Sequence, residues 1–111
     1  MSLVTIEDFQ RVEMRVGKIV DVQDFPEARN PSYKLRIDFG RFGVKRSSAA
    51  IQRWYTKEDL EGRAVVAVTN FPPRQIGPFL SGVLCLGAVQ ADGRVILLRP
   101  DAEGELGARI A

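Results

Sequence analysis

The fold is decided by the stretch YKLRIDFGRFGVKRSSAAI, which runs from Tyr33 to Ile51. Over residues 33–39, apolar side chains occupy every odd position and charged side chains every even position, which is the pattern of a strand with one buried face. Gly40 and Gly43 then predict a turn, and residues 44–51 predict a second strand made of small and polar residues. The stretch therefore predicts two neighbouring strands with a polar face.

The residues on either side predict further strands and two short helices. Thr5 and Asp8 form an acidic variant of a helix capping box, and Thr56 and Asp59 repeat it before Gly62, a typical helix end. The remaining elements are strands at 15–22, 64–69, 83–89 and 95–98, a loop bracketed by prolines at 26–31, an irregular proline-rich loop at 70–78, and a tight turn at 91–94.

Three strands, a short helix and two more strands follow one another in the order of an oligonucleotide-binding (OB) fold. A generic small β-barrel gives no reason for a helix between the third and fourth strands. We therefore predict an all-β chain with a five-stranded OB-fold barrel, to which a short N-terminal helix and an extra C-terminal hairpin are added. With 111 residues and no visible linker or repeat, residues 1–111 are expected to form one domain.

The residue inventory argues against an enzyme. The chain has no histidine, the commonest general base, and its single cysteine, Cys85, lies in an apolar run that predicts a buried thiol in a reducing compartment. These ligands are too few for a zinc site, and no glycine loop of a phosphate-binding kind is present. Ser47 and Ser48 beside Lys45 follow no spacing rule for a serine nucleophile. We expect no catalysis, no cofactor and no metal, and a cytoplasmic protein without a signal peptide or membrane span.

Basic residues gather in the middle of the chain although the net charge is only +2. Residues 34–53 contain six basic side chains and one acid, which indicates a local anion-binding face or, equally well, an ordinary solvated surface. Hydroxyls nearby and the proline-rich loop would extend such a face toward phosphates. The predicted RNA-binding residues are Lys34, Arg36, Lys45, Arg46, Ser47, Ser48, Arg53, Asn70 and Arg74.

Three aromatic or polar residues near this face carry two interpretations each. Trp54 and Tyr55 could stack on bases, although aromatics beside a short helix more often pack against the core. Asn70 could contact RNA, or it could cap a turn at the end of its strand.

Apolar residues around the proline-rich loop suggest a different function. If exposed, Phe71, Ile76, Phe79 and Leu80 would suit a chaperone that holds unfolded or exported polypeptides. The alternative is that these side chains close the end of the barrel.

The two additions to the barrel predict a homodimer. The N-terminal helix is too short to be stable alone, so its apolar face must dock on something. The run from Val95 to Leu98 lacks polar alternation, which predicts burial on both faces. A second copy of the chain, related by twofold symmetry, could cover both elements; alternatively, helix and hairpin bury each other within one chain. The predicted interface residues are Ile6, Phe9, Val12, Ile96 and Leu97.

Several segments together resemble the tRNA-binding domain family, which includes the C-terminal domain of bacterial methionyl-tRNA synthetase. They are IEDF at 6–9, RVGKIV at 15–20, FPEAR at 25–29, KLRIDFG at 34–40, NFPPRQI at 70–76 and LLRPD at 97–101. Within the family the chain is most similar to the CsaA branch. The resemblance implies an OB-fold, a homodimer, tRNA binding without catalysis and, for that branch, peptide or preprotein binding.

The resemblance also assigns residues. Lys34, Ser47, Asn70 and Arg74 lie in matching segments, so the resemblance implies that they contact tRNA. Synthetase-type members carry Val-Ser-Gly-Ile in the third strand, whereas this chain has Arg-Ser-Ser-Ala at 46–49, and its loop at 26–34 is longer than theirs. Both departures follow the CsaA pattern.

Overall fold

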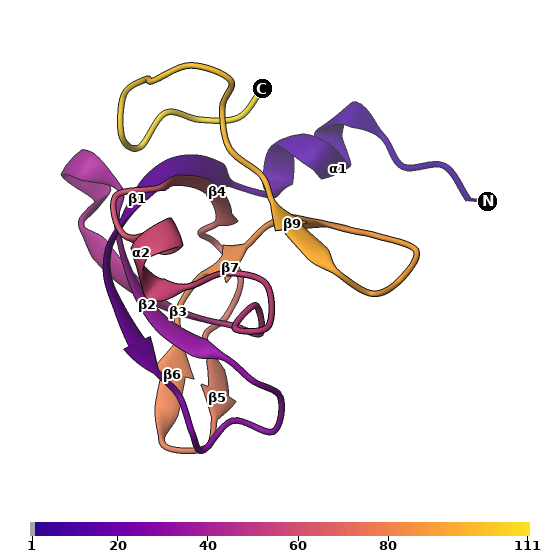
Figure 1. The fold of residues 1–111 in the computed structure, drawn as a ribbon. Coiled ribbons are helices and arrows are strands. Elements are labelled where there is room, and N and C mark those ends of the chain that lie inside the picture. The colour runs from indigo at the N-terminus through magenta and orange to yellow at the C-terminus, as the bar shows by residue number, and fades with distance from the viewer. Residues whose placement is uncertain (1) are drawn as a thin grey trace.

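The computed structural model describes residues 2–111, and its centre is a three-stranded antiparallel meander (Figure 1). The strands are β1 (Met14–Asp24), β2 (Tyr33–Asp38) and β3 (Val44–Ala49), with a 3₁₀ turn, η1 (Gly40–Phe42), between the last two. In β2 the alternation works as predicted, since Leu35 and Ile37 are fully buried while the charged residues between them face outward. These buried side chains form the floor of the barrel core.

β1 is long and bends across the barrel. Its pairing register with β2 shifts between Ile19 and Asp21, which leaves Val20 as an extra, bulged residue. A bulge increases the local twist and redirects the side chains that follow it. As a consequence both Val20 and Asp21 lie on the outer side of the sheet, between the buried residues Ile19 and Val22.

The predicted helix between the third and fourth strands is confirmed as α2 (Lys57–Leu60), which is followed by β4 (Ala64–Val68). Thr56 and Asp59 form the capping box, and Thr5 and Asp8 form the equivalent one at α1 (Ile6–Arg11). Leu60 anchors α2 in the core with no exposed surface, and β4 pairs with β1.

The barrel closes between β3 and the chain after β6 (Phe79–Ser81). The main sheet has the order β3-β2-β1-β4-β7, where β7 is Leu84–Cys85. The carbonyl of Arg46 accepts hydrogen bonds from the amides of Gly82 and Val83 at 2.8 and 3.2 Å, and Ser48 N donates to Ser81 Oγ at 3.0 Å. The result is a nearly closed five-stranded antiparallel barrel, and the predicted OB-like fold is confirmed.

Two segments differ from the prediction. The proline-rich segment 70–78 is not wholly irregular, because β5 (Arg74–Ile76) pairs with β6 to form a hairpin. The prolines sit before β5 and in the turn, at Pro72, Pro73 and Pro78, so none removes a hydrogen-bond donor from the paired residues. Gly77, with φ of +54°, makes the turn possible.

The predicted strand at 83–89 is also divided in two. β7 stays in the barrel, whereas β8 (Gly87–Val89) leaves it and pairs with β9 (Val95–Leu97) in a hairpin of its own. The chain changes sheets at Gly87, where a Cβ atom would lie only 2.4 Å from Val95 Cγ1. Figure 1 shows this hairpin projecting from the barrel on the same side of the view as α1.

The C-terminal segment returns to β1 at the end of the barrel away from the β5–β6 hairpin. Val16 N donates to Ala108 O at 2.9 Å, and Gly107 N donates to Val16 O at 2.8 Å. Within residues 2–111, no helix has the length and apolar character needed to cross a membrane.

Candidate nucleic-acid interface

The outer face of β1, β2 and β3 carries two rows of polar side chains. Strand register aligns Asp21, Arg36 and Arg46 in one row. It aligns Gln23, Lys34 and Ser48 in the next. We call these six residues the outer face; four of them carry charge, and three of the four are basic.

None of the basic residues of the outer face forms an ion pair within residues 2–111, although Asp21 is the Cα partner of Arg36. Arg36 and Arg46 are Cα partners across the two strands, and both are exposed. Within the described residues, ion pairs join Arg11 to Asp8, Arg15 to Glu13 and Lys57 to Asp24, and none involves the outer face. Like charges placed directly opposite each other in a sheet repel, so this arrangement favours an anion between them.

The side chains of Lys34 and Arg46 lie over two aromatic rings. Phe25 and Phe79 are buried and pack against each other with ring centroids 5.4 Å apart. Lys34 Nζ lies 5.0 and 5.6 Å from these two centroids, and the Arg46 guanidinium lies 4.7 Å from that of Phe79. Cation–π attraction of this kind holds the long side chains over the rings while the charges stay accessible.

A cavity of about 410 Å³ opens on the outer face, lined by five of its six residues (all except Ser48) together with Leu35 and Phe79. A second groove, of about 380 Å³, runs past the end of β3 and contains Ser48, Arg29 and Arg74 among mostly small and apolar residues. Arg74 is exposed on β5 opposite Ser81 and lines this groove together with Ser48, so it adds a positive charge there.

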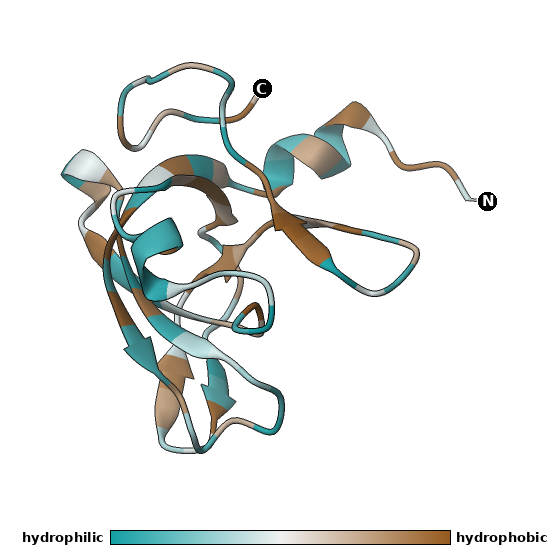
Figure 2. Ribbon diagram, viewed as in Figure 1, coloured by the Kyte–Doolittle hydropathy of each residue, from teal (hydrophilic) through white to brown (hydrophobic). Residues whose placement is uncertain are grey.

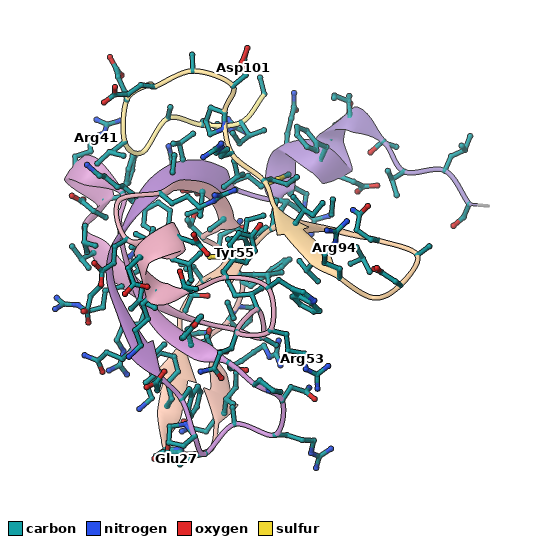
Figure 3. The ribbon with its side chains drawn as sticks, in the orientation of Figure 1. Glu27, Arg41, Arg53, Tyr55, Arg94 and Asp101 are labelled. Carbon is teal, nitrogen blue, oxygen red and sulfur yellow. The ribbon has the colours of Figure 1, made fainter. Side chains whose placement is uncertain are left out.

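Of the predicted RNA-binding residues, four lie on the outer face (Lys34, Arg36, Arg46 and Ser48) and five do not (Lys45, Ser47, Arg53, Asn70 and Arg74). Lys45 pairs with the buried Ile37, and consecutive residues in a strand point to opposite sides, so it faces away from Arg46. Ser47 is fully buried, and its hydroxyl donates to the Ser48 carbonyl at 3.0 Å. Arg53 is exposed on the loop between β3 and α2, where its side chain points outward (Figure 3).

Asn70 has a structural task that matches the capping alternative. Its Oδ1 accepts from Glu13 N at 2.8 Å, and its Nδ2 donates to Arg11 O at 2.7 Å. Both hydrogen-bonding ends of the amide are therefore used in fastening the end of α1 to the end of β4.

A dense polar cluster surrounds this contact. Arg15 Nε donates to Glu13 Oε1 at 2.6 Å, its Nη1 donates to Gly107 O at 2.8 Å, and its guanidinium stacks 3.9 Å from the Phe42 ring centroid. The hydrogen bond from Arg15 lowers the pKa of Glu13, and a hydrogen bond from Thr69 adds to the effect. We call Glu13, Arg15, Thr69 and Asn70 the polar latch, because they join both ends of the chain to the barrel.

The aromatic and thiol groups near α2 serve packing. Trp54 and Tyr55 are partly buried against the core, and Tyr55 Oη accepts from Leu97 N at 3.0 Å (Figure 3). Burial raises the pKa of the Cys85 thiol to about 11, so it stays protonated and unreactive at neutral pH.

The four apolar residues of the proline-rich segment divide between core and surface. Phe79 is buried in the aromatic pair and Ile76 is partly buried, whereas Phe71 and Leu80 are 46% and 45% exposed. Phe71 lines a small apolar pocket of about 210 Å³ together with Leu84. Half of the set therefore closes the barrel end, and half is accessible to a partner.

The predicted dimer residues divide in a similar way. Leu97 lies in the core at 5% exposure, while Ile96 on the other face of β9 is 40% exposed. In α1, Ile6 is 64% exposed, and Phe9 and Val12 are partly buried. Figure 2 shows β9 as hydrophobic along its length, and the 40% exposure of Ile96 shows that one of its faces is left uncovered. Helix and hairpin do not bury each other within the chain, since none of the residues of α1 is buried.

Three residues of this candidate interface were not predicted from the sequence, namely Asp21, Gln23 and Phe25. A usable signal was present, because the alternation Asp-Val-Gln at 21–23 places two polar side chains on the face opposite Val22. Phe25 had no local signal; its contact with Phe79 depends on the β5–β6 hairpin.

The arrangement offers cationic and hydrogen-bonding side chains to a ligand. Nowhere in the described chain do three histidine, cysteine, aspartate or glutamate side chains gather in a way that could hold a metal ion. Fold and surface together define a class, the small OB-like barrel with a basic outer face.

Comparison with known proteins gives the family within this class. Residues 14–109 match the family described as "Putative tRNA binding domain". The crystal structure of the chaperone CsaA from Bacillus anthracis has 44% identity and a TM-score of 0.94, and covers 99% of this chain and 100% of that one. The CsaA chaperone protein from Picrophilus torridus has 50% identity and a TM-score of 0.92, with 98% and 100% covered. The chain belongs to the tRNA-binding domain family, and the resemblance found in its sequence is confirmed.

Longer proteins contain the same domain. The methionine–tRNA ligase of Thermococcus onnurineus is 41% identical over 110 residues, which are 99% of this chain and 15% of that protein. The chain thus spans about a seventh of the curated relatives that it matches.

Proposed function

We propose that this protein binds tRNA through the outer face and Arg74, without catalysing a reaction, and that it does so in the cytoplasm. The observation that carries the proposal is the Arg36–Arg46 pair, two exposed cations held side by side, neither of which forms an ion pair within residues 2–111. Membership of the tRNA-binding domain family supports the same conclusion.

The mechanism we propose is recognition of backbone and shape. Lys34 and Arg46 are fixed over the Phe25–Phe79 pair, so their charges are ordered before RNA arrives. Ordered cations lose less conformational entropy on binding than free lysine or arginine side chains. Phosphate contacts of this kind release counterions, so the affinity is expected to fall steeply as salt increases.

The test is the double variant Arg36→Glu, Arg46→Glu. Its tRNA affinity at low salt should fall by roughly a hundredfold, and the slope of log affinity against log salt should fall by about two. Fluorescence anisotropy with labelled tRNA measures both. The matched control is Lys18→Glu, Arg99→Glu, which reverses two charges that line a cavity beneath the C-terminal segment. Equal losses in the two double variants would refute the proposed site.

We also propose that the protein is a homodimer joined through α1 and the β8–β9 hairpin. The exposed apolar residues Ile6, Val89, Ile96 and Leu98 lie on these two elements or directly after β9. Exposed apolar surface of this extent on a small domain marks an interaction site. A twofold contact would cover helix and hairpin of both copies at once.

Equilibrium sedimentation tests the dimer. The wild-type chain should have twice its 12.3 kDa mass at micromolar concentration, and Ile96→Glu should shift it to the monomer. Leu97→Glu is unsuitable, because Leu97 belongs to the core and the variant would lose stability for that reason. The control is Val44→Glu, which changes an equally exposed residue on β3. A monomeric wild type would refute the proposal.

A second function, the binding of unfolded polypeptides, is supported by exposed apolar side chains near the groove at the end of β3. Phe71, Leu80 and Leu84 are each at least 40% exposed, and two of the matching solved structures are described as chaperones. Binding of an unfolded polypeptide would use this apolar surface and not the outer face. Suppression of aggregation of a reduced client protein should then weaken in Phe71→Ser, Leu84→Ser and persist in Arg36→Glu, Arg46→Glu. The opposite result would exclude polypeptide binding at this groove.

A further inference from the structure

The cavity on the outer face has two chemically different walls. Arg36 and Arg46 form the cationic wall, and Asp21 and Gln23 form a wall that offers hydrogen-bond acceptors. The cavity, at about 410 Å³, falls within the range of ~300–1,000 Å³ that is usual for small-ligand sites. A site for phosphate alone needs no acceptor wall.

Asp21 reaches this cavity because of the bulge in β1. Without the extra residue at Val20, regular alternation would turn Asp21 toward the core and place its neighbours differently. Bulges are frequent next to functional sites, where they redirect a side chain. The carboxylate is therefore placed on the outer face by a specific irregularity of the backbone.

The Asp21 carboxylate is held in one orientation and keeps hydrogen-bond acceptor positions for a ligand. Gln23 Nε2 donates to its Oδ2 at 3.0 Å, which fixes the direction of the group. No ion pair joins Asp21 to its neighbour Arg36 among residues 2–111, although the two are Cα partners. A carboxylate has about four acceptor positions, so roughly three remain available to a ligand.

We propose that this cavity is a subsite for one unpaired guanosine of the bound RNA. Asp21 accepts hydrogen bonds from the Watson–Crick edge of the base, while Arg36 and Arg46 hold an adjacent phosphate. The inference rests on the proposed function, since it adds base selection to the same surface.

Guanine fits because its edge presents two neighbouring donors, N1–H and the N2 amine, to the two oxygens of one carboxylate. Adenine and cytosine each present a single amine beside a ring-nitrogen acceptor, which the carboxylate repels. Uracil presents one N–H between two carbonyl acceptors. Single-stranded RNA is read in this way, through unstacked bases whose Watson–Crick edges are free.

The experiment compares short uridine oligomers that carry one central guanosine, inosine or adenosine. Wild-type protein should bind the guanosine oligomer roughly tenfold more tightly than the adenosine oligomer, as expected for one paired hydrogen-bond contact, with inosine in between because it lacks the N2 amine. Fluorescence anisotropy at constant salt measures the three affinities.

The decisive variant is Asp21→Asn. It should abolish the preference for guanosine. It should also raise the affinity for an oligomer made of uridine alone, because a negative charge is lost beside the phosphates. Gln23→Ala, which releases the orientation of Asp21, should reduce the preference in part. Glu103→Gln removes one charge from the exposed C-terminal segment and should change nothing, so it is the matched control.

Failure of the guanosine subsite and failure of the proposed tRNA binding give different experimental results. If wild-type protein binds tRNA with steep salt dependence but shows no preference among the three oligomers, the guanosine subsite is refuted and the proposed function stands. If the double variant of Arg36 and Arg46 leaves tRNA binding unchanged, the proposed function itself is refuted.

Discussion

The polar latch and the outer face use the same side chain, arginine, in opposite ways. Arg15 in the latch has a carboxylate at 2.6 Å, a carbonyl at 2.8 Å and an aromatic ring at 3.9 Å. Arg36 on the outer face has neither an ion pair nor a cation–π contact in the described part of the chain. A satisfied arginine stabilises the fold, whereas an unsatisfied one is available to a ligand. The comparison predicts that the two regions separate stability from binding.

The largest expected effect belongs to Arg15→Ala. It removes three contacts of the latch and leaves the Gly107 carbonyl without this donor, so the free energy of unfolding should fall by about 2 kcal/mol. Affinity for tRNA should stay within about twofold of wild type, since the electrostatic footprint of the outer face is unchanged. Urea denaturation and anisotropy measure the two quantities. A large loss of affinity in a folded Arg15→Ala would break the division between the regions.

Asn70→Ala should follow with a loss of about 1–2 kcal/mol. Two hydrogen bonds that fasten α1 to β4 disappear, and typical net values are about 1 kcal/mol for each. This variant also tests to which region Asn70 belongs, because the family resemblance implied that Asn70 contacts tRNA. If Asn70→Ala lowers stability and leaves tRNA affinity unchanged, Asn70 belongs to the polar latch. If it lowers tRNA affinity and leaves stability unchanged, Asn70 belongs to the binding site.

The sequence predicted the elements whose signals are local. The alternation in residues 33–39 and the two capping boxes led to β2, α1 and α2 as observed. The hairpin of β5 and β6 escaped prediction because prolines flank its paired residues, which a local pattern reads as a loop. Long-range pairing and tertiary contact decide such segments more than local propensity does.

The candidate site could be derived from the sequence only in part, because some of its contacts join residues far apart in the chain. Lys34, Arg36 and Arg46 follow from charge and strand alternation, and the same rule would have placed Lys45 on the other face. The latch could not be read from sequence, since Asn70 and Glu13 are 57 positions apart. The bulge at Val20 leaves no local pattern either, although it decides where Asp21 points.

The pH dependence of stability tests the latch in a different way. The hydrogen bond from Arg15 lowers the pKa of Glu13 below its ordinary value of 4.5. A carboxyl group with a lowered folded pKa stabilises the protein above the unfolded pKa, and this contribution is lost as pH falls through the folded value. Glu13→Gln should therefore be less stable than wild type at pH 7, with a difference below about 1 kcal/mol that shrinks as pH falls below about 4.5.

Urea denaturation between neutral and acid pH measures this difference. Glu103→Gln is the control, because its side chain lies in the exposed C-terminal segment away from the latch. A difference between wild type and Glu13→Gln that grows toward acid pH would contradict the sign derived from the Arg15 contact.

The smallest effect on stability, and the sharpest test of the comparison, is expected for Arg36→Gln. Arg36 and Arg46 are directly opposite in the sheet, and like charges in such a pair destabilise it by a few tenths of a kcal/mol. Arg36 is also the Cα partner of Asp21, so its removal relieves the repulsion from Arg46 but loses an attraction of similar size. The free energy of unfolding should therefore stay within a few tenths of a kcal/mol of wild type at any salt concentration. Arg46→Gln is less suitable, because it also loses the contact with the Phe79 ring.

Arg36→Gln should nevertheless weaken tRNA binding and lower the salt slope by about one. A variant that is as stable as wild type and binds tRNA less tightly identifies a charge that does not stabilise the fold. This is the property expected of a ligand-binding residue. If Arg36→Gln instead lost stability as Arg15→Ala does, Arg36 would have a structural partner in solution. The outer face would then serve stability as the polar latch does, and the groove that contains Arg74 and Arg29 would become the better candidate for RNA.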